Sequence, residues 1–415
     1  LGIDAGSAYI FDLIGGTWTE TAKLVASDRA HSNKFGVNVS ISGDKAIVGS
    51  YYNDLDSAGE NHVTNAGAAY IFELSGGTWT ETVKLVAPDR GTSDLFGYSV
   101  SISGDKAVVG AYRNNSKTGA AYVYEKNGGL WSTPNKLTAS DKNANDLFGH
   151  SVSMSGDRLI VGAHDDDYNV NGTFIGNCGT AYIFEYSGGT WSETAKLQSS
   201  DKATDDRFGF HVNISNDRAI VGSPFNASDA TGGNSFTEAG SAYIFEFSGG
   251  VWTESQKLEG SDRGLNDRFG RSVGISGNNI LVGAYQNSEA PLAGVSQDKM
   301  GSIYMFQTCS NIAPPVTQIG TTLKVQDVGA AYQWIDCDNN NAIIPSATNQ
   351  SYTATVNGKY AVIVNSYNCV DTSDCINVKN VSINDQNRMI NLHRLYPNPT
   401  ASQVTISNFK TSINK

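Results

Sequence analysis

The loop at residues 164–172 is the segment whose residue types come closest to a metal site. Carboxylate or amide oxygens stand there at alternating positions, on Asp165, Asp167, Asn169 and Asn171. Oxygen ligands at alternating positions are typical of the first part of a calcium-binding loop. In a calcium-binding loop that starts at Asp165, the sixth residue would be Gly and the twelfth would be Glu. Here the Gly stands two residues after the sixth position, at Gly172, and the twelfth residue is Gly176. The sequence therefore predicts either a Ca²⁺ site on these four residues or a solvated polar loop, and we expect no other cofactor.

The residue patterns of common hydrolases are missing from this sequence. None of the six His has the H-E-x-x-H spacing of a zinc protease, and no G-x-S-x-G nucleophile turn occurs. His150 and His211 stand close behind Phe-Gly pairs, where other segments of the chain carry Val37, Tyr98 or Arg271. Since such different side chains occupy equivalent positions, we interpret both histidines as structural.

These residues lie in a frame that repeats five times with constant internal spacing. Tyr70 lies nine residues before Trp79, which lies seventeen before Phe96, and Phe96 lies fourteen before Gly110. The other frames begin at Tyr9, Tyr122, Tyr182 and Tyr243. Only the stretch from that Gly to the next Tyr varies, between 12 and 21 residues. A repeat of this length indicates an array of like modules.

Each repeat predicts four antiparallel strands and no helix. In the unit at 96–141, short segments that alternate polar and apolar residues, or are nearly all apolar, are separated by Gly-containing turns. The strands are expected at 97–103, 106–111, 120–125 and 131–137. Four strands per repeat with recurrent aromatic and Gly residues are typical of a β-propeller blade. The sequence therefore predicts an all-β fold, with a propeller of four-stranded blades over residues 1–307.

Three recurrent residues have structural interpretations. The Gly after each Phe is expected to let two backbones approach closely near the propeller axis. The Trp is expected to pack between blades. An Asp stands seven residues before each Phe, and we expect it to cap a turn. These residues are Asp28, Asp89, Asp141, Asp201 and Asp262.

The predicted strands do not complete a ring. The chain opens on a third strand, and the last repeat ends on a third strand at 302–306, so about five and a half blades are present. A closed propeller of six or seven blades would need residues before Leu1. We therefore expect the propeller to be truncated at its N-terminus.

Recognition is expected in the variable stretch between the second and third strands. These loops share no catalytic-looking residue type; they span 50–66, 111–118, 163–178, 223–239 and 284–300. Large or charged residues near the beginnings of the loops are the predicted ligand-binding residues. They are Tyr51, Tyr52, Asp54, Tyr112, Arg113, His164, Phe225 and Tyr285.

The pair Phe96-Gly97 followed by Val109-Gly110-Ala111, with equivalents in the other repeats, resembles the FG-GAP repeats of integrin-alpha-like β-propellers of the Bacteroidetes type. The resemblance covers residues 1–307 and implies an extracellular binding or adhesion propeller. Calcium-binding members of that family carry a D-x-D-x-D-G loop between these two marks. Here only three residues stand there, such as Ser103-Gly104-Asp105, too few to supply the six to eight oxygens that Ca²⁺ takes. Calcium sites of the family type are therefore not expected.

A second domain is predicted after a linker at 308–315, which contains Pro314-Pro315. Residues 316–380 show short alternating segments and predict a small β-sandwich. This stretch is similar to the Ig-like modules that precede sorting signals in Bacteroidetes-type secreted proteins, with Trp334 as its core. A disulfide would stabilise so small a core, and Cys337, Cys369 and Cys375 are the candidates. A 369–375 bond would clip one hairpin, whereas a bond from Cys337 to either would join distant strands.

The C-terminal segment carries a short secretion motif. Residues 381–391 are polar and predict a second linker. The following Leu395-Tyr396-Pro397-Asn398-Pro399-Thr400 is similar to the opening of the C-terminal sorting domain of the type IX secretion system. The resemblance implies that 392–415 begin such a domain, truncated here. It also implies that the secretion machinery is a partner and that the protein is secreted or displayed on the outer cell surface.

Charge and hydropathy limit the remaining partners. The chain has 29 Lys and Arg against 41 Asp and Glu, a formal net charge of −12, which argues against nucleic acid or an anionic membrane. No apolar run approaches the roughly 20 residues of a membrane-spanning helix. We therefore expect a non-catalytic binding or adhesion protein that presents propeller loops to an extracellular protein or glycan. The alternative is the propeller part of an extracellular enzyme that degrades glycans or peptides. Its catalytic residues would then lie outside this sequence or across the propeller mouth.

Overall fold

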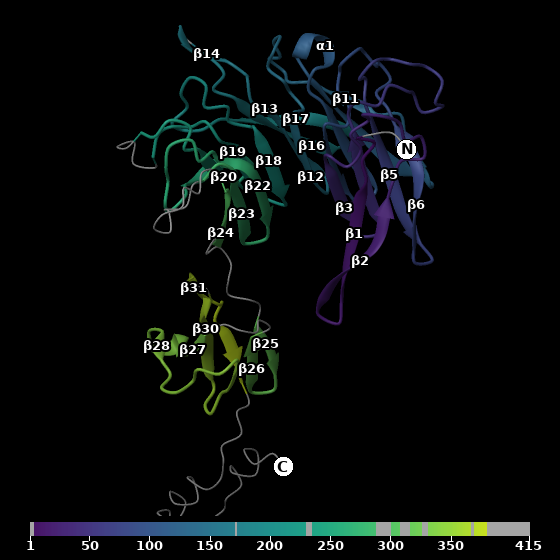
Figure 1. Cartoon of the computed structure of the whole chain (residues 1–415). Helices are drawn as coiled ribbons and strands as arrows, with labels where there is room; N and C mark the ends of the chain where they lie inside the picture. Colours follow the sequence, from purple (N-terminus) through teal and green to yellow (C-terminus); the bar gives the residue numbers. More distant parts are fainter. Residues whose placement is uncertain are drawn as a thin grey trace, which may run out of the picture. The chain divides into compact units, whose positions relative to one another are not determined.

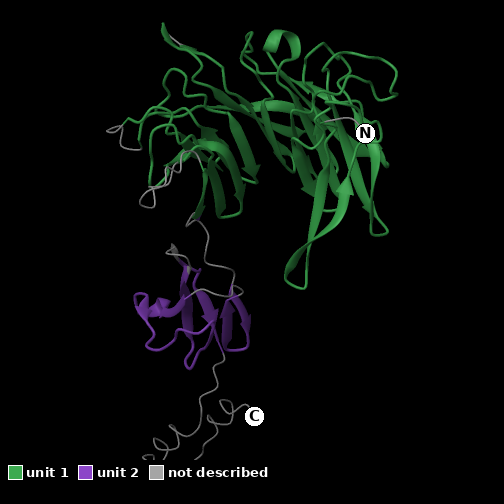
Figure 2. Ribbon diagram, viewed as in Figure 1, with its two compact units in different colours: residues 1–306 green, residues 307–415 purple. Residues whose placement is uncertain are grey.

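The chain consists of two compact units, residues 1–306 and residues 307–415 (Figures 1 and 2). The structure is a computed structural model. It describes residues 4–170, 172–229, 235–287, 300–307, 316–325, 331–366 and 369–379. The predicted linkers at 308–315 and 381–391 and the predicted sorting segment at 392–415 lie outside the described residues.

Unit 1 is built from small antiparallel sheets that follow one another along the chain. Three complete blades run in the order first, second, third and fourth strand; a fourth complete blade has its last strand in two pieces, and the array begins with a hairpin and ends with a three-stranded sheet. The strands are β1 (Ala8–Ile14) and β2 (Thr17–Leu24); β3 (Val39–Ser42), β4 (Lys45–Ser50), β5 (Ala68–Ser75) and β6 (Thr78–Leu85); β7 (Ser99–Ser103), β8 (Lys106–Ala111), β9 (Ala120–Asn127), β10 (Leu130–Trp131) and β11 (Asn135–Leu137); β12 (Ser151–Ser155), β13 (Arg158–Ala163), β16 (Thr180–Ser187) and β17 (Thr190–Leu197); β18 (His211–Ser215), β19 (Arg218–Ser223), β20 (Ser241–Ser248) and β21 (Val251–Leu258); and β22 (Phe269–Ser276), β23 (Asn279–Ala284) and β24 (Ser302–Gln307). The predicted all-β propeller of four-stranded blades is confirmed.

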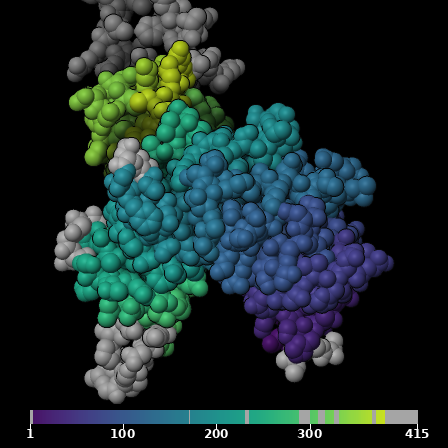
Figure 3. Space-filling model, turned by 90° about the horizontal axis from the view of Figure 1, so that it is seen from above, coloured from purple at the N-terminus to yellow at the C-terminus, as the bar shows by residue number. Residues whose placement is uncertain are grey.

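The blades of unit 1 are arranged in an arc. In the view from above, the colours run round from the purple β1–β2 hairpin to the green sheet of β22, β23 and β24 (Figure 3). The variable loops between second and third strands carry the short helix α1 (Asn114–Lys117) and a small hairpin of β14 (Tyr168–Val170) and β15 (Thr173–Ile175). Pro134 stands between β10 and β11, which both pair with β9. Because Pro has no N–H to donate to the ladder, the fourth strand of this blade is split.

In four of the five repeats, two glycines are required by close backbone approach. Gly97 has φ +86°, and a Cβ there would lie 2.1 Å from the carbonyl oxygen of Ala68. At Gly110 a Cβ would lie 2.0 Å from the carbonyl oxygen of Gly149 in the next blade. Any side chain would force the neighbouring backbone away. The predicted role of the Gly after Phe is therefore confirmed.

The cores of unit 1 lie between successive sheets. One core joins Val108 and Val123 of one blade to Leu159 and Val161 of the next, and Trp191 completes its outer part. Trp191 and Trp252 are each 9% exposed, as expected for residues that pack between blades. Trp18 is 69% exposed, because it lies on the hairpin at the end of the described array.

The recurrent Asp links one blade to the next. Asp201 follows β17, and its carboxylate accepts hydrogen bonds from the Tyr243 hydroxyl on β20 and from Lys257 Nζ on β21, both at 2.7 Å. Burial raises the pKa of the equivalent Asp28 carboxyl, but hydrogen bonds from Lys84 and Tyr70 outweigh it and hold the pKa below its ordinary value. The same contacts occur at Asp89 and Asp141 with the Tyr and Lys of their next blades, and Asp262 accepts from Tyr304. The prediction that these aspartates cap turns is wrong, because their carboxylates bond across the blade boundary instead.

One blade departs from this pattern at a buried position. Asn114 and Asn226 each donate an amide hydrogen to a second buried carboxylate, Asp94 at 2.8 Å and Asp206 at 3.0 Å. The equivalent residue in the blade of β13 is Asp166, which is 1% exposed and lies 3.0 Å from Lys196 Nζ. Burial first, and then the charges of Asp166 and its neighbours, raise the pKa of Asp146 to about 7. A carboxylate thus stands where the sister blades have an amide donor.

Unit 2 consists of two sheets around one core. The core contains Leu323, Trp334, Val362 and Val378, all 0% exposed. The elements are β25 (Val316–Ile319), β26 (Thr322–Val325) and β29 (Ser351–Thr353) in one sheet, and β27 (Ala331–Asp336), β28 (Ala342–Ile343), β30 (Gly358–Ser366), β31 (Cys369–Thr372) and β32 (Ile376–Val378) in the other, with the 3₁₀ helix η1 (Cys337–Asn339) after β27.

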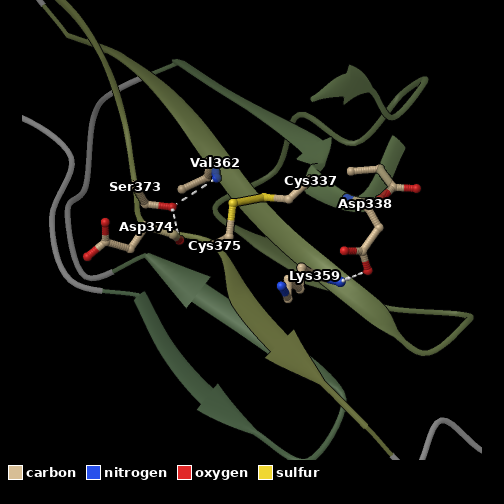
Figure 4. Close-up of a disulfide and its surroundings, with 8 residues drawn as sticks. Cys337, Asp338, Lys359, Val362, Ser373, Asp374 and Cys375 are labelled. Atoms are coloured by element: carbon tan, nitrogen blue, oxygen red, sulfur yellow. Dashed lines mark hydrogen bonds between the residues drawn. A yellow bond between two sulfur atoms is a disulfide. The ribbon is translucent and has the colours of Figure 1, made fainter. Parts of the chain in front are cut away.

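A disulfide joins Cys337 to Cys375, 38 residues apart in the chain (Figure 4). Of the pairings that the sequence leaves open, this one ties η1 to the segment before β32. Closing a loop of this length stabilises the folded chain by about 3–4 kcal/mol in the chain-entropy model. Cys178 is free and buried, and Cys309 lies outside the described residues.

No helix among the described residues is long and apolar enough to cross a membrane. The longer of the two helical elements given above, α1, has four residues.

We expect Asp201→Ala to lower the free energy of unfolding by about 2–3 kcal/mol, because it leaves the buried Tyr243 hydroxyl without its acceptor and removes the nearest carboxylate from the Lys257 ammonium. Lys257 keeps its bonds to Asn226 Oδ1 and to the Ser228 carbonyl oxygen. The matched control is Asp105→Ala, since the Asp105 side chain is 65% exposed and lies 3.3 Å from Lys45. An exposed pair of this kind is worth about 0–1 kcal/mol. Urea denaturation followed by tryptophan fluorescence measures both variants, and equal losses would contradict the inter-blade role.

A pH-dependent effect is expected for Asp166→Asn, which restores the amide found in the sister blades. Because the pKa of Asp146 is raised to about 7 in the folded state, folding takes up a proton at this carboxyl. The contribution of Asp146 to the free energy of unfolding therefore falls as pH rises from about 4 to 7. The added amide removes a neighbouring charge and gives Asp146 a donor. We expect Asp166→Asn to raise the free energy of unfolding relative to the wild type, and to raise it by about 1 kcal/mol more at pH 8 than at pH 5.5. This difference corresponds to a fall of somewhat under one unit in the pKa of Asp146. Urea denaturation at the two pH values measures this difference, and a gain independent of pH would refute the account.

Candidate functional site

The innermost strands of unit 1 line a cavity of about 510 Å³, which we call the channel. Its lining residues come from β3, β7, β12 and β18, from the residues directly before each of these strands, and from β22. The residues that directly follow the five Phe-Gly pairs all line it, and since these strands run in the same direction they share one end, the channel mouth. They are Val37, Tyr98, His150, Phe210 and Arg271.

A chain of neighbouring rings lies along the channel mouth, and we call it the aromatic belt. It consists of rings that contact one another in succession, Tyr51, Tyr52, Tyr98, Tyr112, His150, His164, Phe210 and Phe225, and of Tyr285, which joins them through the Arg271 guanidinium. Ring centroids lie 5.5 Å apart between Tyr51 and Tyr98, 5.0 Å between Tyr98 and His150, and 4.8 Å between His150 and Phe210. The belt therefore joins residues from five successive repeats.

Three arginines lie against the far part of the belt. The guanidinium carbons of Arg207 and Arg268 lie 4.9 and 5.0 Å from the centroid of Phe225, on which they stack. Arg271 lies closest, 4.0 Å from the centroid of Phe210. Guanidinium groups over aromatic faces are held by the ring quadrupole, so this part of the mouth combines apolar surface with positive charge.

The histidines of the mouth are neutral at physiological pH. Burial, with a smaller contribution from the charge of the nearby Arg271, lowers the pKa of His150 to about 3 and that of His211 to about 4. Burial and the neighbouring His150 lower the pKa of His164 well below its ordinary value. His211 Nδ1 accepts a hydrogen bond from the Val273 N–H at 3.3 Å. Its proton is therefore on Nε2, where it is a donor.

Side chains of one innermost strand satisfy backbone groups of the next. Ser40 Oγ accepts from the Ile102 N–H at 3.1 Å, and Ser151 Oγ accepts from the Val212 N–H at 3.0 Å. The same type of bond links Met154, Ile214 and Ile275 to the preceding blades. Within the described part of the chain, the innermost strands have no strand neighbour on the channel side, so these bonds replace the missing ladder. The channel wall is therefore made of side chains rather than of open strand edges.

Most of the predicted ligand-binding residues lie together in the structure. Tyr51, Tyr52, Tyr112, His164, Phe225 and Tyr285 all belong to the aromatic belt. Arg113 is exposed, and its guanidinium stacks on the Tyr112 ring at 5.6 Å. Asp54 does not join them, because its carboxylate is used within its own loop, where it accepts from the Asn65 N–H at 2.6 Å and pairs with His62 at 3.1 Å. Their role in binding stays a prediction.

Sequence reasoning missed the residues at the centre of the mouth. Tyr98, His150, Phe210 and Arg271 follow Phe-Gly pairs, and the variety of side chains at this position favoured a structural interpretation. In a ring of blades, equivalent positions converge on one axis, so different side chains there build one asymmetric site. The position in the repeat was the available signal.

The predicted calcium loop is only partly described. Asp165 Oδ1 lies 3.4 Å from Arg207 Nε, and Asp167 Oδ1 accepts from the Asn177 N–H at 2.7 Å. Asn169 lies in β14, and Asn171 lies outside the described residues. Within the described part of the chain, no group of three or more His, Cys, Asp or Glu side chains is placed to hold a metal ion. Binding of Ca²⁺ to this loop stays a prediction.

The repeated sheets, with their Phe-Gly and Val-Gly marks, define a β-propeller built from like blades. The family model for the FG-GAP repeat matches residues 18–72, 79–124, 131–184, 191–245 and 252–306. These segments make up more than half of the chain, which therefore belongs to the FG-GAP repeat family. A comparison with curated proteins finds no match.

We expect the resonances of His150 and His211 to stay constant between pH 5 and 8, because burial holds the pKa values of both rings near 3 and 4. The measurement is a pH titration of the imidazole Cε1–H chemical shifts by NMR, with His150→Gln and His211→Gln used for assignment. A titration midpoint between pH 6 and 7 for either ring would show that the mouth is more hydrated than this structure indicates.

Proposed function

We propose that the protein is a secreted or cell-surface binding protein of the adhesion type, which takes an extracellular glycan or protein at the channel mouth. The aromatic belt is the observation that carries this proposal. Tyr285 is 45% exposed, and Tyr51, Tyr98 and Tyr112 are half-buried, although the rings that hold the blades together are fully buried. Large rings that stay accessible at a concave surface are typical of binding sites.

The lining of the channel supports binding rather than hydrolysis. Most glycosidases use a pair of carboxylates on either side of the bond they cleave. The residues that line the channel in the described part of the chain include Ser, Asn, His and aromatic side chains but no Asp or Glu. This surface offers hydrogen bonds and ring faces, and it lacks the acid and base of an enzyme of that class.

The C-terminal part of the chain supports export. FG-GAP repeat proteins are often extracellular, and the motif at 395–400 is similar to a type IX sorting signal. We infer that unit 2 is an Ig-like module between the propeller and this signal, since its two sheets enclose a core centred on Trp334. The secretion machinery would then be the second partner of the protein.

The test compares Tyr98→Ala and Phe210→Ala with the wild-type chain of 415 residues on a glycan array and in pulldowns from extracellular extracts. Loss of one stacking ring is expected to lower the affinity for the captured ligand about 3- to 10-fold, since an aromatic pair contributes about 0.5–1.5 kcal/mol beyond its buried area.

The matched control is Phe174→Ala, which removes a ring that is 64% exposed and lies on the small hairpin outside the belt. Affinities are measured by surface plasmon resonance, with thermal melting to verify the fold of each variant. Equal losses in the control and in the belt variants would refute the channel mouth as the binding site.

A further inference from the structure

Among the described residues, one charged side chain lines the channel without a carboxylate partner, and it is Arg271. The Arg271 guanidinium is half-buried between the rings of Phe210 and Tyr285, at 4.0 and 5.6 Å from their centroids. Its neighbour Arg268 pairs with Glu238 at 2.6 Å. Among the described residues, Arg271 has no carboxylate within ion-pair distance, so its charge faces the channel.

The rest of the channel offers nothing that would repel an anion. Arg271 is the only charged residue among the described residues that line it, apart from the two histidines, which are neutral. This is unusual in a chain with 41 Asp and Glu. An isolated cation inside a cavity of an acidic protein concentrates anionic ligands there against the overall charge.

The channel wall can donate further hydrogen bonds. His211 lines the channel with its proton on Nε2, as derived above. Ser40 and Ser151 accept hydrogen bonds from neighbouring backbone N–H groups, and a hydroxyl that accepts a bond keeps its own proton to donate. Oxygen atoms of a ligand would therefore meet donors on several sides of the cavity.

We propose that the channel mouth binds an acidic sugar, with its carboxylate on the Arg271 guanidinium and its ring against Tyr98; this inference rests on the proposed function above. A guanidinium matches a carboxylate with two parallel hydrogen bonds. The cavity volume of about 510 Å³ lies in the range of roughly 300–1,000 Å³ that is typical of small-ligand sites.

The channel wall favours a sugar over an acidic peptide. Extended peptides are commonly held by main-chain hydrogen bonds to an exposed strand edge. Here the N–H groups of Ile102, Val212 and Ile275 are already bonded to side chains of the preceding blade. Hydroxyls, rings and one guanidinium remain, and these suit a polyhydroxylated ring with a carboxylate.

The experiment is calorimetric titration of the full chain with oligosaccharides of galacturonic, glucuronic and mannuronic acid. The neutral galactose, glucose and mannose oligomers of the same length, and a glutamate peptide, are the comparison probes. We expect at least one acidic sugar to bind, more weakly at high salt, and its neutral counterpart to bind at least tenfold more weakly.

Arg271→Gln is expected to lower the affinity for the acidic sugar about 10- to 100-fold, as loss of hydrogen bonds to a charged group does. Arg29→Gln removes an equal charge at an exposed position and is expected to change nothing. Arg271→Lys keeps the charge and is expected to bind more tightly than Arg271→Gln. Thermal melting verifies the fold of each variant.

Four outcomes would overturn the inference: no acidic sugar binds, neutral sugars bind equally, the glutamate peptide alone binds, or Arg271→Gln binds as the wild type does. The proposed function fails separately. If Tyr98→Ala and Phe210→Ala lower the affinity for a captured ligand while Arg271→Gln does not, the proposal of binding at the mouth is retained and the proposal of an acidic sugar is rejected.

Discussion

The carboxylate that follows each fourth strand is the contact on which the propeller depends. Apolar sheets can pack face to face in several rotations, because the hydrophobic effect has no direction. The hydrogen bonds that Tyr243 and Lys257 donate to Asp201 remove this freedom, because they fix one carboxylate at the end of a blade against two strands of the next blade. Each family repeat runs from a fourth strand to the third strand of the following blade. The sequence repeat thus contains both the Asp and its Tyr partner, and it crosses the blade boundary that this contact holds.

A second constraint acts at the centre of the array. The backbones approach so closely at Gly97 and Gly110 that no side chain fits there, and the innermost strands then lie side by side around the channel. Their backbone N–H groups are bonded by Ser and Asn side chains of the preceding blade, so little of the wall is free to vary. The first residue after each Phe-Gly pair is limited neither by the close backbone approach nor by the side-chain bonds to the backbone of the next blade. It lines the channel mouth, and the five repeats carry Val, Tyr, His, Phe and Arg there.

The site was predictable in part. Residues at the beginnings of the variable loops, such as Tyr51 and His164, were identified from their size and from the variation in loop length. Arg271 and Phe210 were not, because a comparison of repeats treats different side chains at one position as tolerance. In a linear array that interpretation would hold. In a ring of blades, five different side chains at one position are five parts of a single surface.

The spacing of Tyr, Trp, Phe and Gly by itself determined the strand pattern, the blade and the close approach at glycine, because these depend on local periodicity and on the absence of a side chain. Sequence also named three cysteines, but only the fold decided that Cys337 pairs with Cys375. The partners of the recurrent aspartates, the aromatic belt and the position of Arg271 in the channel lining likewise came from the tertiary structure. Each of these depends on residues 33 or more positions apart or on the convergence of several blades, and no local sequence pattern specifies which distant atoms come within bonding distance.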